Sequence, residues 1–257
     1  MKISGNTILI TGGGSGIGRG LAESFHTLGN KVIIAGRRQS MLDATMTANP
    51  GMESLVFDVG DRDAILTFAA RVTAKYPTLN VLINNAGIMR SEKFLVQPID
   101  PVVAEATIAT NLLGPIRLTT ALLPLLVAKP QAAIMTVSSG LAFMPMAMTP
   151  TYCATKAAIH SYTQSLRYQL KETSVQVLEI IPPYVQTDLT GSRQASDPNA
   201  MPLKDFIAET MNILKTSPDA TEICVERVKP MRFAEANGTY DAFFKNFNDR
   251  LAAAAAH

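Results

Sequence analysis

The sequence predicts an α/β fold: a doubly wound parallel sheet of about seven strands flanked by helices, in a single domain over residues 1–257. Short β-branched apolar runs alternate with longer segments of helical period. The runs are apolar on both faces, as strands covered by helices on each side should be. They are "TILIT" (7–11), "KVIIA" (31–35), "SLVF" (54–57), "VLIN" (81–84), "AAIMTV" (132–137), "VQVLEII" (175–181) and a last, weaker strand at 223–228. This alternation implies right-handed crossovers.

Several helices have recognisable starts. Asp61 can cap a helix over 62–76, and Asp100 followed by Pro101 can open a long helix that reaches about Leu126. A further patterned helix spans 152–170. The small-residue loop after 188 and the amphipathic helix that follows are expected to form a substrate lid over 188–216, and residues 231–257 a separate C-terminal tail.

Composition excludes several functions. Lysine plus arginine number 23 against 21 acidic residues, so no electrostatic footprint for nucleic acid is present. The sequence contains no long uncharged apolar run, so no membrane span is predicted. Two cysteines are too few for a disulfide framework, and the N-terminus lacks a signal-peptide core, so a cytoplasmic location is expected. His26 and His160 have no partners at metal-ligand spacing, so both are predicted to be structural and no metal site is expected.

A glycine-rich turn follows the first strand directly and opens a helix. Glycine lets the backbone approach a ligand closely, and a helix N-terminus offers free N–H groups to a phosphate. In this strand–turn–helix context the turn predicts a Rossmann-type dinucleotide site rather than a merely steric turn. The residues expected to contact the cofactor here are Gly12, Gly14, Ser15, Gly16, Ile17 and Gly18.

The end of the second strand indicates which dinucleotide is bound. An acidic residue there usually holds a free ribose hydroxyl, whereas arginine accommodates a 2′-phosphate. The sequence has Arg37 and Arg38 and no acid at that point, which favours NADP(H), with NAD(H) as the alternative if both arginines are plain surface charges. Asp58 and Val59, after the third strand, are expected near the adenine, with a loop or helix-cap role as the alternative for Asp58.

Tyr152 and Lys156 are four residues apart on a predicted helix, so their side chains share a face. A free tyrosine has a pKa of about 10. A nearby ammonium favours the phenolate, so Lys156 is expected to lower the pKa of Tyr152 into a range useful for acid–base catalysis. Ser139 ends the fifth strand, and strand ends and following helices meet where α/β sites form.

Taken together, these pieces resemble the short-chain dehydrogenase/reductase family, over nearly the whole chain. The matching residues are "TGGGSGIG" (11–18), "NNAG" (84–87), Asn111, Ser139 and "YCATK" (152–156). The resemblance implies that Tyr152 protonates the substrate oxygen, that Lys156 also holds the nicotinamide ribose, that Ser139 binds the substrate oxygen, and that Asn111 anchors a relay water. It further implies cofactor contacts at Asn85, Ala86, Gly87, Pro182, Val185 and Thr187. Pro183 stands where the family commonly has glycine, so the backbone there is expected to differ.

The expected activity is hydride transfer between NADP(H) and a ketone, aldehyde or secondary alcohol. The expected pocket lining is apolar or amphipathic, which favours a neutral carbonyl substrate; its candidates are Met89, Phe143, Met144, Met146, Met148 and Tyr184. A sugar-nucleotide epimerase or dehydratase shares the glycine turn and the Tyr-x-x-x-Lys pair, although such chains are longer. A non-catalytic NAD(P)-binding regulatory protein is a third class, with little reason to keep the catalytic residues together. By analogy with the family, a homodimer or homotetramer is expected.

Overall fold

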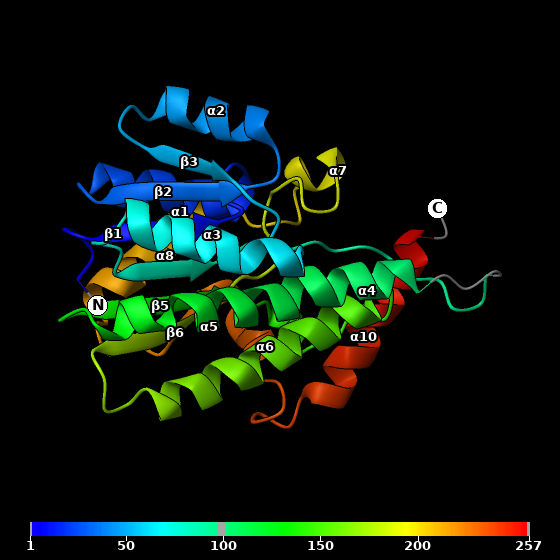
Figure 1. Ribbon diagram of the computed structural model, residues 1–257. Helices are drawn as coiled ribbons and strands as arrows, with labels where there is room; N and C mark the ends of the chain where they lie inside the picture. Colours follow the sequence, from blue (N-terminus) through cyan, green and yellow to red (C-terminus); the bar gives the residue numbers. More distant parts are fainter. Residues whose placement is uncertain (1, 97–100, 256–257) are drawn as a thin grey trace.

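The computed structural model describes residues 2–96 and 101–255, which fold into three layers with one parallel sheet in the middle (Figure 1). The strand order is β3-β2-β1-β4-β5-β6-β7, and every neighbouring pair is parallel. This confirms the predicted fold class. The strands are β1 (Thr7–Thr11), β2 (Lys31–Gly36), β3 (Glu53–Val56), β4 (Val81–Asn84), β5 (Ala132–Val137), β6 (Val175–Ile181) and β7 (Glu222–Cys224).

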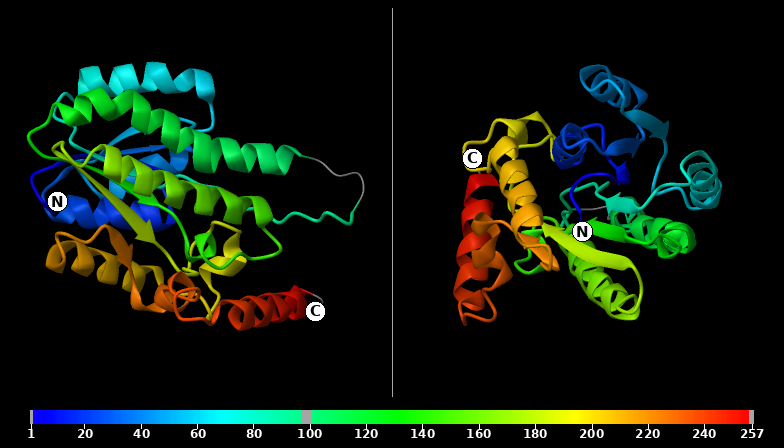
Figure 2. Two further views of the ribbon diagram at one scale, coloured as in Figure 1. Left: turned by 90° about the horizontal axis from the view of Figure 1, so that it is seen from below. Right: turned by 90° about the vertical axis from the view of Figure 1, so that its left-hand side faces the viewer.

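Helices cover both faces of the sheet (Figure 2). One face carries α1 (Gly16–Thr27), α2 (Gln39–Ala48) and α8 (Leu203–Thr216), whose apolar residues share one buried cluster with the sheet. The other face carries α3 (Arg62–Lys75), α5 (Gly114–Val127) and α6 (Pro150–Gln169), which enclose a second cluster. As predicted, Asp61 caps α3: its Oδ1 accepts the backbone N–H groups of Asp63 and Ala64 at 2.9 and 3.2 Å.

The crossover through α8 departs from the expected handedness. Both α1 and α8 lie on the same face and contact each other. However, the connection from β1 to β2 moves toward the β3 edge of the sheet, whereas the connection from β6 to β7 moves toward the opposite edge. The two connections therefore have opposite hands, and β6–α8–β7 is the exception to the right-handed rule.

The position of α8 also shortens the segment that can act as the predicted substrate lid. Phe206 is fully buried, and Ile207 packs so closely on α1 that a Cβ at Gly20 would lie 2.7 Å from it. A helix anchored in the core cannot move as a lid, so the lid role stays a prediction for residues 188–202 alone. That loop contains the short helix α7 (Ser192–Ala195).

The predicted long helix is interrupted. It consists of α4 (Val102–Ile108), one π-helical turn η1 (Ala109–Leu113) and α5. The expected cap at Asp100 lies outside the described residues. By length and composition alone the run Val102–Val127 could cross a membrane, but its buried leucines pack against the sheet. A sheet-covering core helix passes the same test, so this is weak evidence for a span.

The C-terminal region differs from the expectation. The predicted strand at 223–228 ends at Cys224, because the chain turns where Val228 N–H donates to the carbonyl of Val225 and a short helix, η3 (Glu226–Val228), forms. The tail then contains α9 (Lys229–Arg232) and α10 (Tyr240–Ala255). Asn248 of α10 accepts the N–H of Ala147 at 2.7 Å and donates to the carbonyl of Pro145 at 3.1 Å. The tail is therefore attached to the segment that follows Ser139.

Candidate active site

The turn between β1 and α1 can be formed only by small residues. Gly12 and Gly16 have φ of +67° and +52°, in the left-handed region that favours glycine. A Cβ on Gly18 would lie 2.3 Å from the carbonyl oxygen of Gly12, so α1 packs directly against the turn. Ser15 is extended before the first turn of α1, and that turn holds no acidic residue. The free N–H groups of this helix start fit a phosphate, which is the contact a dinucleotide requires.

The loop after β4 is hydrogen-bonded to the glycine-rich turn between β1 and α1. Asn85 Nδ2 donates to the carbonyls of Thr11 and Gly12 at 2.9 and 3.3 Å. In return, the hydroxyl of Thr11 accepts the N–H groups of Asn85 and Ala86, both at 3.1 Å. The amide of Asn85 thus holds the glycine turn in place, and the cofactor contacts predicted for Asn85, Ala86 and Gly87 stay a prediction. Sequence reasoning missed the role of Thr11.

Arg38 reaches the glycine turn. Its Nη2 donates to the hydroxyl of Ser15 at 3.0 Å, which joins the end of β2 to the start of α1. Arg37 lies 3.7 Å from Asp58 Oδ2, and the other oxygen of Asp58 accepts the N–H of Gly60. Arg38 is exposed beside the glycine-rich turn between β1 and α1. Asp58 stabilises its own loop, which is the alternative role that the sequence left open.

Three further residues predicted to contact the cofactor are Val59, Val185 and Thr187. Val59 is buried, and its carbonyl lies against Gly114 of α5. Across the site, Thr187 in the segment after β6 lies 3.3 Å from where a Cβ on Gly16 would be. Val185 and Thr187 are held by the buried Gln194, whose Nε2 donates to the Val185 carbonyl at 2.8 Å and to the Thr187 hydroxyl at 3.0 Å. The segment after β6 therefore packs against the glycine-rich turn, although Pro183 replaces the glycine common in the family.

Ser139, Tyr152 and Lys156 meet at the carboxyl end of β5. Ser139 lies two residues after the end of β5 and precedes the short helix η2 (Gly140–Ala142), and the Gly140 N–H donates to the carbonyl of Pro182 at 2.9 Å. The Ser139 side chain lies close enough to the phenol of Tyr152 to act on its pKa. Lys156 lies one turn further along α6, with its Nζ 5.6 Å from the centre of the Tyr152 ring, and it donates to the carbonyl of Val137 at 2.7 Å. The predicted cluster is therefore assembled.

The protonation of this cluster differs from the prediction. Burial raises the pKa of Tyr152 to about 12, and the Ser139 side chain offsets this only in part. Burial lowers the pKa of Lys156 to about 8, against the opposing charge of Glu179. The expectation that Lys156 brings the pKa of Tyr152 below its usual value is therefore wrong for these residues alone, because burial is the largest influence on the pKa of Tyr152 and raises it.

Asn111 lies in the π-helical turn, a feature that often occurs at functional sites. Its side chain accepts the N–H of Ile88 and donates to the Ile88 carbonyl, both at 2.8 Å, and also approaches Thr155 Oγ1 at 3.4 Å. Asn111 therefore links the loop after β4 to the catalytic helix. Its predicted role in anchoring a relay water stays a prediction.

The predicted pocket-lining residues divide into two groups. Met89 and Met146 are half-buried, Met148 is 36% exposed and Tyr184 is 47% exposed, with its hydroxyl on Asp197. Met144 is fully buried, and Phe143 packs edge-on against His160 with a ring-centre distance of 4.7 Å. Met144 does not line an open pocket, because its side chain is fully buried, whereas Phe143 is partly buried and its pocket role stays a prediction.

Glu92 is a site residue that the sequence did not reveal. Its carboxylate accepts the Thr151 N–H at 3.0 Å and the Thr151 hydroxyl at 2.8 Å. The helix start itself lacks a side-chain cap from Thr149, so Glu92 satisfies the first turn of α6 from another segment. It thereby anchors the turn that carries Tyr152. No local pattern signals this contact, because the two residues are 59 positions apart.

Comparisons with known proteins agree with this architecture. The short chain dehydrogenase family model matches residues 6–198. The uncharacterized oxidoreductase DltE of Bacillus subtilis (strain 168) is 39% identical over 251 residues, which cover 96% of this chain and 98% of that protein. The closed form of serine dehydrogenase complexed with NADP+ is 26% identical, with a TM-score of 0.74 over 84% of this chain and 93% of that one. A short-chain dehydrogenase from Sphingobium yanoikuyae in complex with NADPH is 25% identical, with a TM-score of 0.77 over 93% and 95% of the two chains.

A phosphate cradle and a Ser–Tyr–Lys cluster at one edge of a parallel sheet define an oxidoreductase of the Rossmann type with a nicotinamide cofactor. The family model covers well over half of the residues. The chain belongs to the short-chain dehydrogenase/reductase family.

Proposed function

We propose that the protein is an NADP(H)-dependent oxidoreductase that interconverts a neutral ketone or aldehyde and the corresponding alcohol. The observation that carries this proposal is the contact of Ser139 with the Tyr152 phenol, one helical turn from Lys156 and beside the glycine cradle. Cytoplasmic location and a homo-oligomeric state remain expectations.

The residues of the chain support a defined proton transfer. When bound, the nicotinamide supplies the hydride that adds to the carbonyl carbon. Ser139 and Tyr152 hold the carbonyl oxygen, and Tyr152 gives its phenolic proton to that oxygen, so the product is an alcohol and the phenol becomes a phenolate. A Tyr152 pKa of about 12 keeps the proton on the phenol at neutral pH. The ammonium of Lys156 then stabilises the phenolate.

The substrate proposal rests on the surroundings of the cluster. Met146 and Met148 lie between Ser139 and Tyr152 in the sequence, and Met89 lies in the loop after β4. All three are at least partly accessible, and methionine adapts to irregular apolar shapes. A neutral carbonyl compound suits such a lining better than a charged acid.

A Tyr152→Phe variant tests the reaction. NADPH binding is followed by its fluorescence, and NADPH oxidation by absorbance against a panel of aryl and aliphatic ketones, aldehydes and sugars. We expect the variant to bind NADPH as the wild type does and to lose at least about 100-fold in turnover, as expected when a general acid is removed. If the wild type binds NADPH but does not oxidise it with any carbonyl compound of the panel, a non-catalytic regulatory protein is favoured. Conversion of a sugar nucleotide without net oxidation of the cofactor would favour the epimerase reading.

The cofactor preference is tested at Arg38. Its guanidinium beside the Ser15 hydroxyl is suited to a 2′-phosphate. We expect Arg38→Gln to weaken NADPH binding by about 10- to 100-fold, the equivalent of a lost charged hydrogen bond, and to leave NADH binding unchanged. Arg62→Gln, at the exposed start of α3, is the matched control. Equal loss of both cofactors in Arg38→Gln would contradict the proposal.

A further inference from the structure

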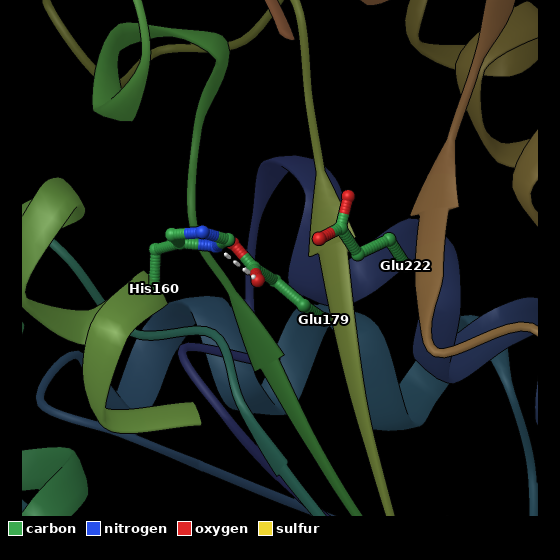
Figure 3. A group of neighbouring side chains, drawn as sticks. All are labelled: His160, Glu179 and Glu222. Atoms are coloured by element: carbon green, nitrogen blue, oxygen red, sulfur yellow. Dashed lines mark hydrogen bonds and ion pairs between the residues drawn. The ribbon is translucent and has the colours of Figure 1, made fainter. Parts of the chain in front are cut away.

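Three titratable side chains from α6, β6 and β7 point toward one another: the buried Glu179 and the partly buried His160 and Glu222 (Figure 3). Glu179 on β6 and Glu222 on β7 are direct partners in the parallel register, so their side chains project to the same side of the sheet. His160 comes from α6, and its Nδ1 lies 2.7 Å from Glu179 Oε2. The ligand-type atoms of all three residues lie within 4.8 Å of one another. The spacing of residues around His160 gave no sign of these partners, because they come from other elements of the fold.

An arginine supplies a cation to this cluster. Arg232 binds Glu222 through two hydrogen bonds, Nε to Oε2 at 2.8 Å and Nη2 to Oε1 at 3.0 Å. The same guanidinium stacks on Phe143, 4.5 Å from the ring centre, and Phe143 packs edge-on against His160. A divalent metal would have to displace the arginine from Glu222 and break the bond between His160 and Glu179. The cluster is therefore an ion-pair network rather than a metal site.

Glu179 is the unusual member of the network. It is fully buried, and among the described residues its Oε1 has no hydrogen-bond partner. A buried carboxylate is costly unless cations offset its charge. His160 contacts one oxygen of the carboxylate. Two cations also interact with Glu179 electrostatically: Lys156 on α6 and Arg232 on α9.

Geometry connects Glu179 to the catalytic lysine. Tyr152, Lys156 and His160 follow one another at intervals of four on α6, so they form one stripe of the helix. Lys156 donates to the Val137 carbonyl on β5, and Val137 pairs in register with Ile180, the neighbour of Glu179. Glu179 points to the face of the sheet that α6 covers, where His160 contacts it, so the carboxylate and the ammonium lie on the same side of the sheet.

We propose that Glu179, oriented by His160, is a positioning residue that keeps Lys156 protonated and in place beside Tyr152. Burial disfavours the ammonium of Lys156, and the carboxylate of Glu179 opposes that effect. The groups that face this site are Lys156 and His160 from α6, Glu179 from β6, Glu222 and Cys224 from β7 and Arg232 from α9. The meaning of this role for catalysis rests on the proposed function, but the test does not.

The titration of Lys156 tests the proposal without any substrate. Protein labelled with 13C at lysine Cε is titrated by NMR, and the Lys156 signal is assigned by its absence in Lys156→Met. Glu179→Gln keeps the size of the side chain and removes its charge. We expect the Lys156 midpoint to fall, because the carboxylate of Glu179 raises the pKa of Lys156 and its removal leaves the effect of burial unopposed. An unchanged midpoint would overturn the proposal, whether or not the protein reduces carbonyls.

Three further variants separate positioning from general damage. His160→Leu leaves the buried carboxylate without its hydrogen-bond partner, so Glu179 should no longer be held in place and the Lys156 midpoint should fall as in Glu179→Gln. His160→Asn returns a donor at the Nδ1 position and should restore most of the shift. Glu222→Gln lies one strand further away and should lower thermal stability with a much smaller shift. An equal shift in Glu222→Gln, or one equivalent of divalent metal in the purified protein, would overturn the assignment.

Discussion

Lys156 is a buried cation whose charge weakens the folded state. The residue is 5% exposed, and burial lowers its pKa from 10.5 to about 8. One pKa unit corresponds to about 1.4 kcal/mol, so at neutral pH the charged lysine costs the fold about 3 kcal/mol. A residue with this cost is retained for what it does rather than for stability.

Replacing Lys156 by methionine should therefore stabilise the protein while abolishing turnover. Methionine keeps the length of the side chain and removes the charge. It leaves the Val137 carbonyl without its 2.7 Å donor, which costs about 1–2 kcal/mol. The net gain is about 1–2 kcal/mol, or about 3–6 °C in Tm for a chain of this size. Differential scanning calorimetry at pH 7 measures it, with the exposed Lys204→Met of α8 as a control that should leave Tm unchanged.

The pH dependence of this difference has a definite sign. Below pH 8 Lys156 is charged in both states, and the full penalty is present. Between about 8 and 10.5 the folded protein has released the proton that the unfolded chain still holds, so the wild type gains stability as the pH rises. The Tm gap between Lys156→Met and the wild type should thus close between pH 8 and 10. A variant that is less stable than the wild type at pH 7, or a gap that stays constant to pH 10, would refute the reasoning.

Two further predictions concern the supports of the site. Gly18→Ala places a methyl group 2.3 Å from the Gly12 carbonyl, so the cradle must shift, and we expect NADPH binding to weaken by at least tenfold in a fluorescence titration; unchanged binding would remove the turn from the cofactor site. Glu92→Ala releases the first turn of α6 from Thr151, so kcat should fall several-fold while the KM for NADPH is retained, and circular dichroism should show a loss of about 1 kcal/mol in stability. A normal kcat in that variant would show that Tyr152 is held without Glu92.

The fold could be predicted because its signals are local. The buried strands are β-branched runs, and only the last of them, at 223–228, was misplaced, since valines at 225 and 228 continue the apolar pattern through a turn. The role of α8 was missed for another reason. An amphipathic pattern shows that one face of a helix is covered, but not by what, and here the cover is α1 of the core.

The site could be predicted only where its residues are close in sequence. Tyr152 and Lys156 share a helix, and Arg38 follows a recognisable strand. The contacts of Asn111 with Thr155 and of Glu92 with Thr151 span 44 and 59 residues and have no local pattern. The relative strength of burial and charge is also a property of packing, which is why the direction of the Tyr152 pKa shift was wrong.

Glu179 left a signal that could have been used. It is the lone charge in the apolar run "VQVLEII", which the sequence predicts to be covered on both faces. A carboxylate in such a strand requires cationic or hydrogen-bonding partners. The sequence could therefore indicate that partners exist, but only the register of β6 and β7 and the packing of α6 identify them as His160 and Lys156.

The shifts of Tyr152 and Lys156 together indicate the direction in which these residues work. The phenol keeps its proton up to a pKa of about 12, whereas the ammonium begins to lose its proton near 8. Raising the pH therefore removes the charge of Lys156 before it produces a phenolate. Carbonyl reduction needs a phenol that donates and an ammonium that stabilises the resulting phenolate, and both forms coexist below pH 8. Alcohol oxidation needs the phenolate first, which this chain alone disfavours at every pH where Lys156 is charged. Under the proposed function, a Glu179 that sustains this charge would extend the pH range in which Ser139, Tyr152 and Lys156 favour reduction.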